Sequence, residues 1–202
     1  MTQPKIGLLT LFFEMYLTSG DALLKSCTAF SLKLAENLAN HAVVVYPGVC
    51  INRSDVDKAV YRFETEDVDL IVVVFLTYTP SMYVLPALKK TQLPVLLFCT
   101  QKMPAVTEAI TPWDTDENHG VHGYQDLANV LRRAGKAYQY LAGYWKDEKT
   151  QSELISWLQA AHARKVLQSS GLGLLGYPME NMGDFGVDET AFQSQLGLHI
   201  YH

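Results

Sequence analysis

The sequence lacks long hydrophobic runs, which argues against a membrane-spanning helix. Its longest runs, such as residues 70–76, are far shorter than the roughly 20 apolar residues that a spanning helix needs. The N-terminus leads directly into an apolar strand pattern and has no signal-peptide cleavage pattern. We therefore expect a cytoplasmic protein that binds no membrane.

Cysteine and positive charge are also scarce. Cys27, Cys50 and Cys99 each fall within an apolar pattern. An odd number of cysteines without regular spacing predicts reduced thiols in the protein core rather than disulfides. Lysine and arginine number 16 against 21 acidic residues, the formal net charge is -5, and no basic stripe is present. This balance argues against nucleic acid as a partner.

The chain has no glycine-rich motif of the kind that binds phosphates. No Gly-x-Gly-x-x-Gly turn follows the first predicted strand, and no Walker sequence occurs anywhere. The glycines of residues 171–176 have a similar spacing, but they lie in an apolar strand pattern that is not followed by a helix start. These absences argue against a dinucleotide or a flavin as cofactor. A serine elbow for covalent catalysis is absent as well.

Strand and helix patterns alternate along the chain. Nearly continuous apolar runs, typical of strands covered on both faces, occur at residues 5–12, 42–46, 70–75, 94–99, 138–144 and 171–176. Apolar residues recur at helical spacing between these runs. We predict that Ser54 caps the second helix and that Gly135 ends the helix before residue 138 in a left-handed conformation. The alternation predicts an α/β fold: an open parallel sheet with helices on both faces, of flavodoxin-like or Rossmann-like type.

The pattern changes near the C-terminus. Residues 179–188 have the composition of a loop, and residues 190–202 begin a further element without completing it. We therefore predict an α/β domain over residues 1–178 and the incomplete start of a following domain over residues 179–202.

A polar cluster over residues 112–123 is the strongest candidate for a site. It contains His119, His122, two glycines and several carboxylates, and it precedes an amphipathic helix. Open α/β sheets bind ligands at the carboxyl ends of their strands. We expect four loops at that edge, after the first, third and fourth strands and after the strand at 171–176. Their aromatic, amide and imidazole groups suit a neutral polyhydroxylated ligand; an ordinary hydrophilic connection is the alternative.

Two other uses of these residues are open. His119 and His122 are three residues apart and lie near Asp114, Asp116 and Glu117, so they could bind a metal, but no third ligand is fixed. Hydrogen bonds from the two imidazoles to ligand hydroxyls explain them better.

The aromatic residues Tyr78 and Trp113 fit either of two places. They could form an apolar wall beside the ligand, or they could pack into the core.

The order and spacing of several segments resemble L-arabinose isomerase over nearly the whole chain, and the fucose isomerases are more distantly similar. The segments are Pro112–Asp116, Asn118–Gly123, Thr77–Pro80, Cys99–Gln101, Ala142–Trp145 and Asn181–Met182. The resemblance implies an aldose–ketose isomerase with a Rossmann-like N-terminal domain.

The same resemblance implies a metal and an assembly. The family uses a divalent metal, usually Mn²⁺, held by two glutamates and two histidines in central and C-terminal domains that this sequence does not contain. It forms homo-oligomers, trimers or hexamers, in which the N-terminal domain reaches a neighbouring active site. The present segment then contributes subunit contacts and part of a sugar pocket, and we do not expect it to be active alone. A stand-alone, non-catalytic sugar-binding or assembly module is the alternative.

By position, the resemblance assigns sugar-binding roles to individual residues. His122 matches a histidine beside the sugar, and Tyr78 matches an aromatic residue after the third strand. Tyr16 and Met182 match further pocket positions, and His119 stands where arabinose isomerases commonly have glutamine. Phe13 stands where the family usually has a polar residue, so the resemblance leaves the identity of the sugar open. The predicted substrate-binding set is therefore His122, His119, Tyr78, Tyr16 and Met182, with no catalytic or metal-binding residue in this segment.

Overall fold

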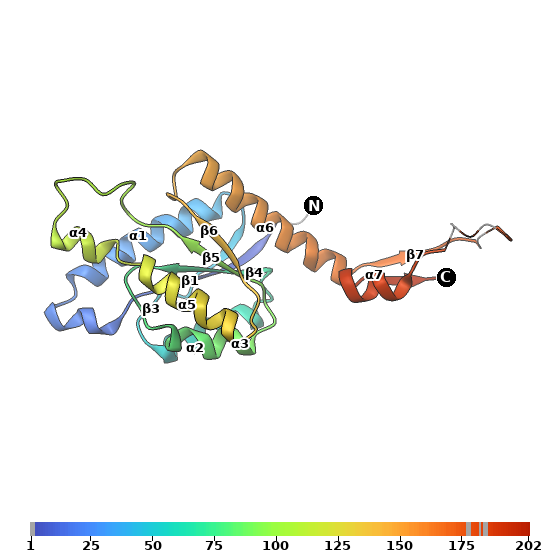
Figure 1. Cartoon of the computed structure of the whole chain (residues 1–202), viewed down its shortest axis with the longest axis horizontal. Coiled ribbons are helices and arrows are strands. Elements are labelled where there is room, and N and C mark those ends of the chain that lie inside the picture. Colours follow the sequence, from blue (N-terminus) through green and yellow to red (C-terminus); the bar gives the residue numbers. More distant parts are fainter. Residues whose placement is uncertain (1–2, 177–178, 182, 184–185) are drawn as a thin grey trace.

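The computed structural model describes residues 3–176, 179–181, 183 and 186–202, and its main body is a parallel sheet between two layers of helices (Figure 1). The strands of this sheet are β1 (Lys5–Leu11), β2 (Val43–Val45), β3 (Val49–Cys50), β4 (Leu70–Phe75), β5 (Val95–Cys99) and β6 (Gln139–Ala142). Their order is β2-β1-β4-β5-β6, and β3 pairs with β1 beyond the end of β2. With β2 and β3 counted as one interrupted strand, this is the strand order of flavodoxin-like sheets. The predicted fold class is confirmed.

Helices cover both faces of the sheet, as the alternating sequence pattern predicts. On one face α1 (Ala22–Ala39) and α6 (Glu148–Gln168) pack against residues such as Leu8 and Val72. On the other face α2 (Arg53–Thr65), α3 (Ser81–Lys90) and α5 (Val121–Arg133) pack against residues such as Leu9 and Val73. Successive strand residues point to opposite faces, so a strand buried on both faces is apolar throughout. All six residues of β4 are accordingly buried.

Of the two helix boundaries predicted from the sequence, one differs in the structure and one is confirmed. The cap of α2 is Asn52, whose side chain accepts a hydrogen bond from the Asp55 N–H, and not Ser54, which lies inside the helix. Asp55 returns a bond by accepting from the Ile51 N–H, so the carboxylate and the amide together fix the helix start. The prediction for Gly135 is confirmed, since it follows α5 with a φ of 70°.

The polar cluster is more regular than the sequence suggested. Residues Pro112–Glu117 form the short helix α4, which begins with a capping box between Thr111 and Asp114 and has proline at its first position. The prediction of a loop that carries the cluster was therefore wrong for residues 112–117, and α5 already begins at Val121. The local reason is the Thr-Pro-x-Asp sequence at 111–114, which satisfies the free N–H groups of a helix start.

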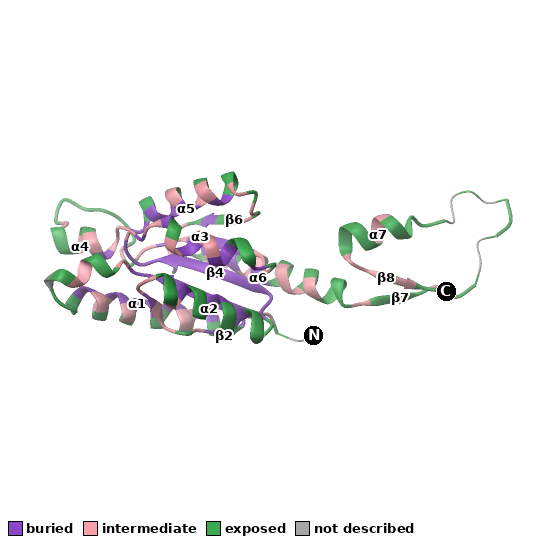
Figure 2. Cartoon of the chain, turned by 90° about the horizontal axis from the view of Figure 1, so that it is seen from below, coloured by how far each residue is buried: buried purple, intermediate pink, exposed green. Residues whose placement is uncertain are grey.

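The C-terminal residues form an arm that projects from the main body beyond the end of α6 (Figures 1 and 2). Strand β7 (Gly171–Gly173) pairs in parallel with β8 (His199–Tyr201), and α7 (Glu189–Leu196) lies between them in sequence. The strand predicted at 171–176 therefore does not join the main sheet, and the described residues of the loop that follows it belong to the arm (Figure 2). Neither β7 nor α7 contains a buried residue. A two-stranded sheet of this kind gains little stability by itself.

Within the ranges that the structure describes, no helix combines the length and the apolar character needed to cross a membrane.

Gly120 of the polar cluster lies directly against the backbone of β4, and we expect Gly120→Ala to destabilise the protein. A Cβ atom at this position would lie 2.4 Å from the Phe75 carbonyl oxygen, a backbone atom that cannot easily shift. Overpacking of this kind costs about 1–3 kcal/mol, which lowers the Tm by roughly 2–10 °C in a chain of this size. Thermal unfolding followed by circular dichroism measures the change. Gly173→Ala is the matched control, since nothing lies within 4 Å of its Cβ position; equal Tm values for both variants would contradict the prediction.

The three cysteines are free thiols, and we expect two of them to be unreactive in the native protein. Burial raises the pKa of Cys27 and of Cys50 to about 12; nearby Lys102 lowers the pKa of Cys27, but burial outweighs it. Only the thiolate is nucleophilic, and at pH 8 almost none is present at such a pKa. Titration with a disulfide reagent at pH 8 should therefore leave Cys27 and Cys50 unmodified in buffer and label all three cysteines in denaturant. Rapid labelling of either residue in buffer would be incompatible with this burial.

Candidate functional site

The loops after β1 and β4 meet at the carboxyl edge of the sheet, beside the polar cluster. β1 pairs with β2 and β3 on one side and with β4 on the other, so the chain changes direction between β1 and β4. Ligands of open α/β sheets bind at such a switch point. The two loops are joined by a hydrogen bond of 3.1 Å from the Phe13 N–H to the Thr77 hydroxyl. Two of the predicted ligand-binding loops thus form one surface.

A fully buried tyrosine fastens α5 to this edge. The Tyr124 hydroxyl accepts a hydrogen bond of 3.0 Å from the Phe75 N–H and donates one to the Phe98 carbonyl, so it joins the ends of β4 and β5. Burial raises the pKa of Tyr124 well above its ordinary value, so the phenol keeps its proton as a donor. Because Tyr124 lies two residues after His122, the same contact fixes the first turn of α5.

His119 and His122 form a hydrogen-bonded chain with Tyr16. The Tyr16 hydroxyl lies 3.2 Å from His119 Nδ1, and His119 Nε2 lies 2.8 Å from His122 Nδ1. Burial, with Asp116 and Tyr78 nearby, raises the pKa of Tyr16. A protonated Tyr16 donates to His119, whose Nε2–H then donates to His122 and leaves the His122 Nε2–H pointing outward. The chain can run in the opposite direction if the tautomers exchange, so the exposed His122 can donate or accept.

Aromatic rings form a wall beside these histidines. The Tyr78 ring lies 6.4 Å from the His119 ring, measured between centroids. Phe13 contacts Tyr78, Tyr16 and Tyr83 edge to face at 5.8–6.4 Å. Edge-to-face contacts of this kind hold rings in fixed orientations. The structure therefore brings together four of the five predicted site residues, Tyr16, Tyr78, His119 and His122.

The other aromatic candidate and the last predicted residue lie elsewhere. Trp113 is 45% exposed on α4, so core packing does not explain it. Met182 lies outside the described residues. Its neighbour Asn181 belongs to the segment between β7 and α7, away from the sheet edge.

A buried carboxylate, which the sequence did not single out, anchors α4. Glu117 is only 6% exposed, and its carboxylate lies 2.7 Å from the Lys102 ammonium and accepts a hydrogen bond from the Ser26 hydroxyl of α1. Lys102 also donates to the Ser26 hydroxyl at 2.9 Å. A buried charge is tolerated only when it is paired and hydrogen-bonded in this way. The network connects α1, the 100–111 loop and α4.

Asn118, the residue after Glu117, is held in place by hydrogen bonds of its own side chain. Its side-chain oxygen accepts from the Met103 N–H at 2.9 Å, and its amide donates to the Asp114 carbonyl at 2.6 Å. Both of its polar ends are therefore used within the protein, directly before His119. The sequence holds no local signal for the anchoring role of Glu117, because its partners Ser26 and Lys102 are distant in the chain.

The histidines do not form a metal site in this arrangement. Both ring nitrogens of His119 are used in hydrogen bonds, to Tyr16 and to His122, so His119 has no nitrogen left for a metal. Across residues 3–176, 179–181, 183 and 186–202, no three His, Cys, Asp or Glu side chains lie close enough together to hold a metal ion. The donor set of the site therefore does not fit Mn²⁺.

We expect Lys102→Met to destabilise the protein because it leaves Glu117 buried without its charged partner. Loss of one partner of a buried pair is costly, but Lys102 itself is 40% exposed, so we expect a loss of about 2 kcal/mol in the free energy of unfolding. Urea denaturation measures it. Lys25→Met is the matched control: its pair with Asp21 is 73% and 65% exposed, and such pairs contribute about 0–1 kcal/mol. If the two variants were equally stable, Glu117 would not be an anchor.

Comparison with known proteins identifies the family. A model of the L-arabinose isomerase N-terminal domain matches residues 15–169. The L-arabinose isomerase of Phocaeicola vulgatus is 25% identical over 165 residues, which cover 78% of this chain and 31% of that protein. L-arabinose isomerase 1 of Clostridium acetobutylicum is 23% identical over 192 residues, which cover 90% of this chain and 38% of that protein. The chain thus spans less than two fifths of the length of these curated relatives. Because the family model matches most of the chain, this protein belongs to the L-arabinose isomerase N-terminal domain family.

Proposed function

We propose that this chain acts as the N-terminal domain of an aldose–ketose isomerase related to L-arabinose isomerase, and that it supplies one wall of the sugar pocket. The observation that carries the proposal is the chain of hydrogen bonds from Tyr16 through His119 to the exposed His122. It ends at the carboxyl edge, beside the ring of Tyr78. Membership of the family supports the same reaction class.

The site suits a neutral sugar for two reasons. Imidazole and phenol groups each donate and accept, as sugar hydroxyls do, and they match a ligand that has no charge. An aromatic ring at the side of the site packs against the C–H face of a sugar. His122 orients one hydroxyl in this scheme, and Tyr16 and His119 act through it as positioning residues.

The rim of the site supports a second part of the proposal, that another subunit of a homo-oligomer covers it. Exposed apolar side chains occur on the elements at this edge: Met15 of the 3-10 helix η1 (Glu14–Ser19), Met82 of α3, Trp113 of α4 and Val121 of α5 are each 42–60% exposed. Exposed apolar residues that gather around a polar site mark an interaction surface. We assign any Mn²⁺ of the assembled enzyme to residues outside this chain.

We expect His122→Ala to weaken sugar binding without unfolding the domain. Titration of the ¹⁵N-labelled chain with L-arabinose and with L-fucose should shift resonances of His119, His122 and Tyr16. Loss of one hydrogen bond weakens binding by about five- to tenfold. His41→Ala, at an exposed histidine in the turn before β2, is the matched control. Unchanged binding in His122→Ala, with native circular dichroism, would remove His122 from the pocket.

A stand-alone binding or assembly module is the second candidate, because the chain of hydrogen bonds from Tyr16 to His122 can bind a sugar without any catalytic group beside it. The intact mass of the natural gene product separates the two candidates. A longer product with Mn²⁺-dependent isomerase activity, in which His122→Ala lowers turnover about tenfold, supports the isomerase. A product that ends at His202 and binds sugar without turnover supports the module.

A further inference from the structure

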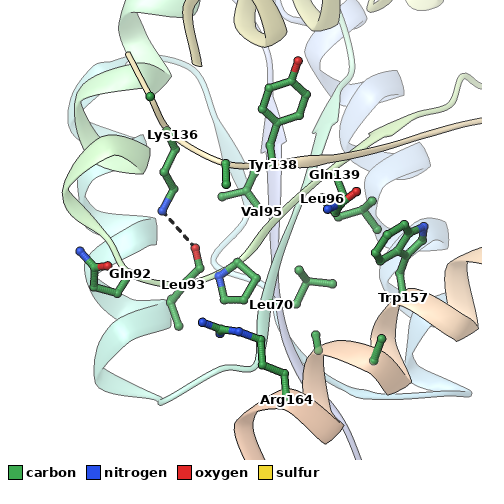
Figure 3. Close-up of a pocket in the computed structure, with 15 residues that line it drawn as sticks. Leu70, Gln92, Leu93, Val95, Leu96, Lys136, Tyr138, Gln139, Trp157 and Arg164 are labelled. Carbon is green, nitrogen blue, oxygen red and sulfur yellow. Dashed lines mark hydrogen bonds between the residues drawn. The ribbon is translucent and has the colours of Figure 1, made fainter. Parts of the chain in front are cut away.

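A cavity of about 490 Å³ lies at the opposite edge of the sheet, where β5 and β6 begin (Figure 3). Its lining comes from the ends of the strands, from the segment before β6 and from α6. The site described above lies at the carboxyl edge of the sheet, after β1 and β4, so the length of the strands separates the two. The volume lies within the range of small-molecule sites, roughly 300–1,000 Å³.

The cavity has an apolar part and a cationic part. Leu70 and Leu96 are buried residues of its lining, and Trp157 of α6 packs against the same core cluster. In Figure 3, Trp157 and Leu96 lie toward one side, and Lys136 and Arg164 lie toward the other. The lining is therefore amphipathic along the cavity.

The charge of the lining is of one sign. Lys136 and Arg164 are two cations, and the described residues that line the cavity include no Asp or Glu. This contrasts with the whole chain, whose formal net charge is -5. In an adjoining hollow, Asp67 and Asp69 are carboxylates that already pair with Lys165, at 2.9 and 3.2 Å.

The two cations differ in how they are held. Lys136 donates to the Thr91 carbonyl at 2.6 Å and to the Leu93 carbonyl at 3.3 Å, so its ammonium is fixed at the cavity wall. Burial lowers the pKa of Lys136, and Glu64 offsets part of that effect. Arg164 is exposed, and among the described residues its guanidinium has no hydrogen-bond or ion-pair partner. A guanidinium in this state can bind a carboxylate through two parallel hydrogen bonds.

We propose that this cavity binds an amphipathic monoanion, a small molecule with a planar apolar body and one carboxylate. The apolar body lies against Trp157, Leu70 and Leu96, and the carboxylate lies between Arg164 and Lys136. The site is separate from the sugar edge, so it gives the domain a second ligand that is chemically unlike the first.

The test uses 2-naphthoate as the probe and 2-naphthamide as its uncharged counterpart of the same shape. Each is titrated into the ¹⁵N-labelled chain, and the indole N–H resonance of Trp157, assigned with Trp157→Phe, reports binding. We expect 2-naphthoate to bind about tenfold more tightly than the amide, as a charge-assisted pair predicts. Arg164→Gln should weaken 2-naphthoate about tenfold and leave the amide unchanged. Arg133→Gln, at an exposed arginine near the end of α5, is the matched control and should change neither.

Three outcomes would overturn the proposal. Equal affinity for the acid and the amide would show that charge plays no part. Unchanged binding of 2-naphthoate to Arg164→Gln would place the carboxylate elsewhere. Shifts of the Trp157 resonance with protein concentration instead of probe concentration would show that a second copy of the chain covers the cavity. Because none of these measurements involves sugar binding or isomerase activity, they are independent of the function proposed for His122.

Discussion

The pairing of β1 with β4 is the constraint on which the rest of the structure depends. Six consecutive residue pairs hold the two strands in parallel, from Ile6 with Leu70 to Leu11 with Phe75. Parallel pairing puts the carboxyl ends of β1 and β4 at one edge, and the segments that follow the two strands begin there. The segment that contains Tyr16 and the loop that contains Tyr78 are neighbours because of this pairing. A one-residue slip would exchange the two faces of each strand and expose the core.

The site at this edge is fixed by buried polar groups more than by apolar packing. Tyr124 joins α5 to β4 and β5 through its hydroxyl, and Glu117 joins α4 to α1 through Ser26 and Lys102. Each group is costly to bury and stabilises only the arrangement that satisfies it. Residues 118–122 lie between these two attachments, so His119 and His122 have little freedom to separate. Donors and acceptors that are already fixed bind a sugar with a smaller loss of conformational entropy.

Much of the fold was predictable from periodicity, and part of the site was predictable from topology. Continuous apolar runs located every strand of the main sheet except the two-residue β3, and the α/β alternation predicted that loops at one edge converge. The caps were harder: Asn52 and Ser54 are both good capping residues, and each is followed three residues later by an aspartate, so only the structure identifies Asn52 as the cap. The capping box of Thr111 and Asp114 was predictable in principle, because its two residues are only three positions apart. Glu117 was not predictable as an anchor, because Ser26 lies 91 residues away in the chain.

The sequence by itself determined that strands and helices alternate, that the sheet is parallel and buried on both faces, and that polar residues collect in its carboxyl-end loops. These properties depend on residue type and local spacing. Only the tertiary structure decided which side chains meet: that His119 bonds to both Tyr16 and His122, and that β7 pairs with β8 in an arm outside the main sheet. The reason is physical. Hydrogen bonds and strand ladders act over a few ångströms in space, and an apolar run is the same whichever partner it finds.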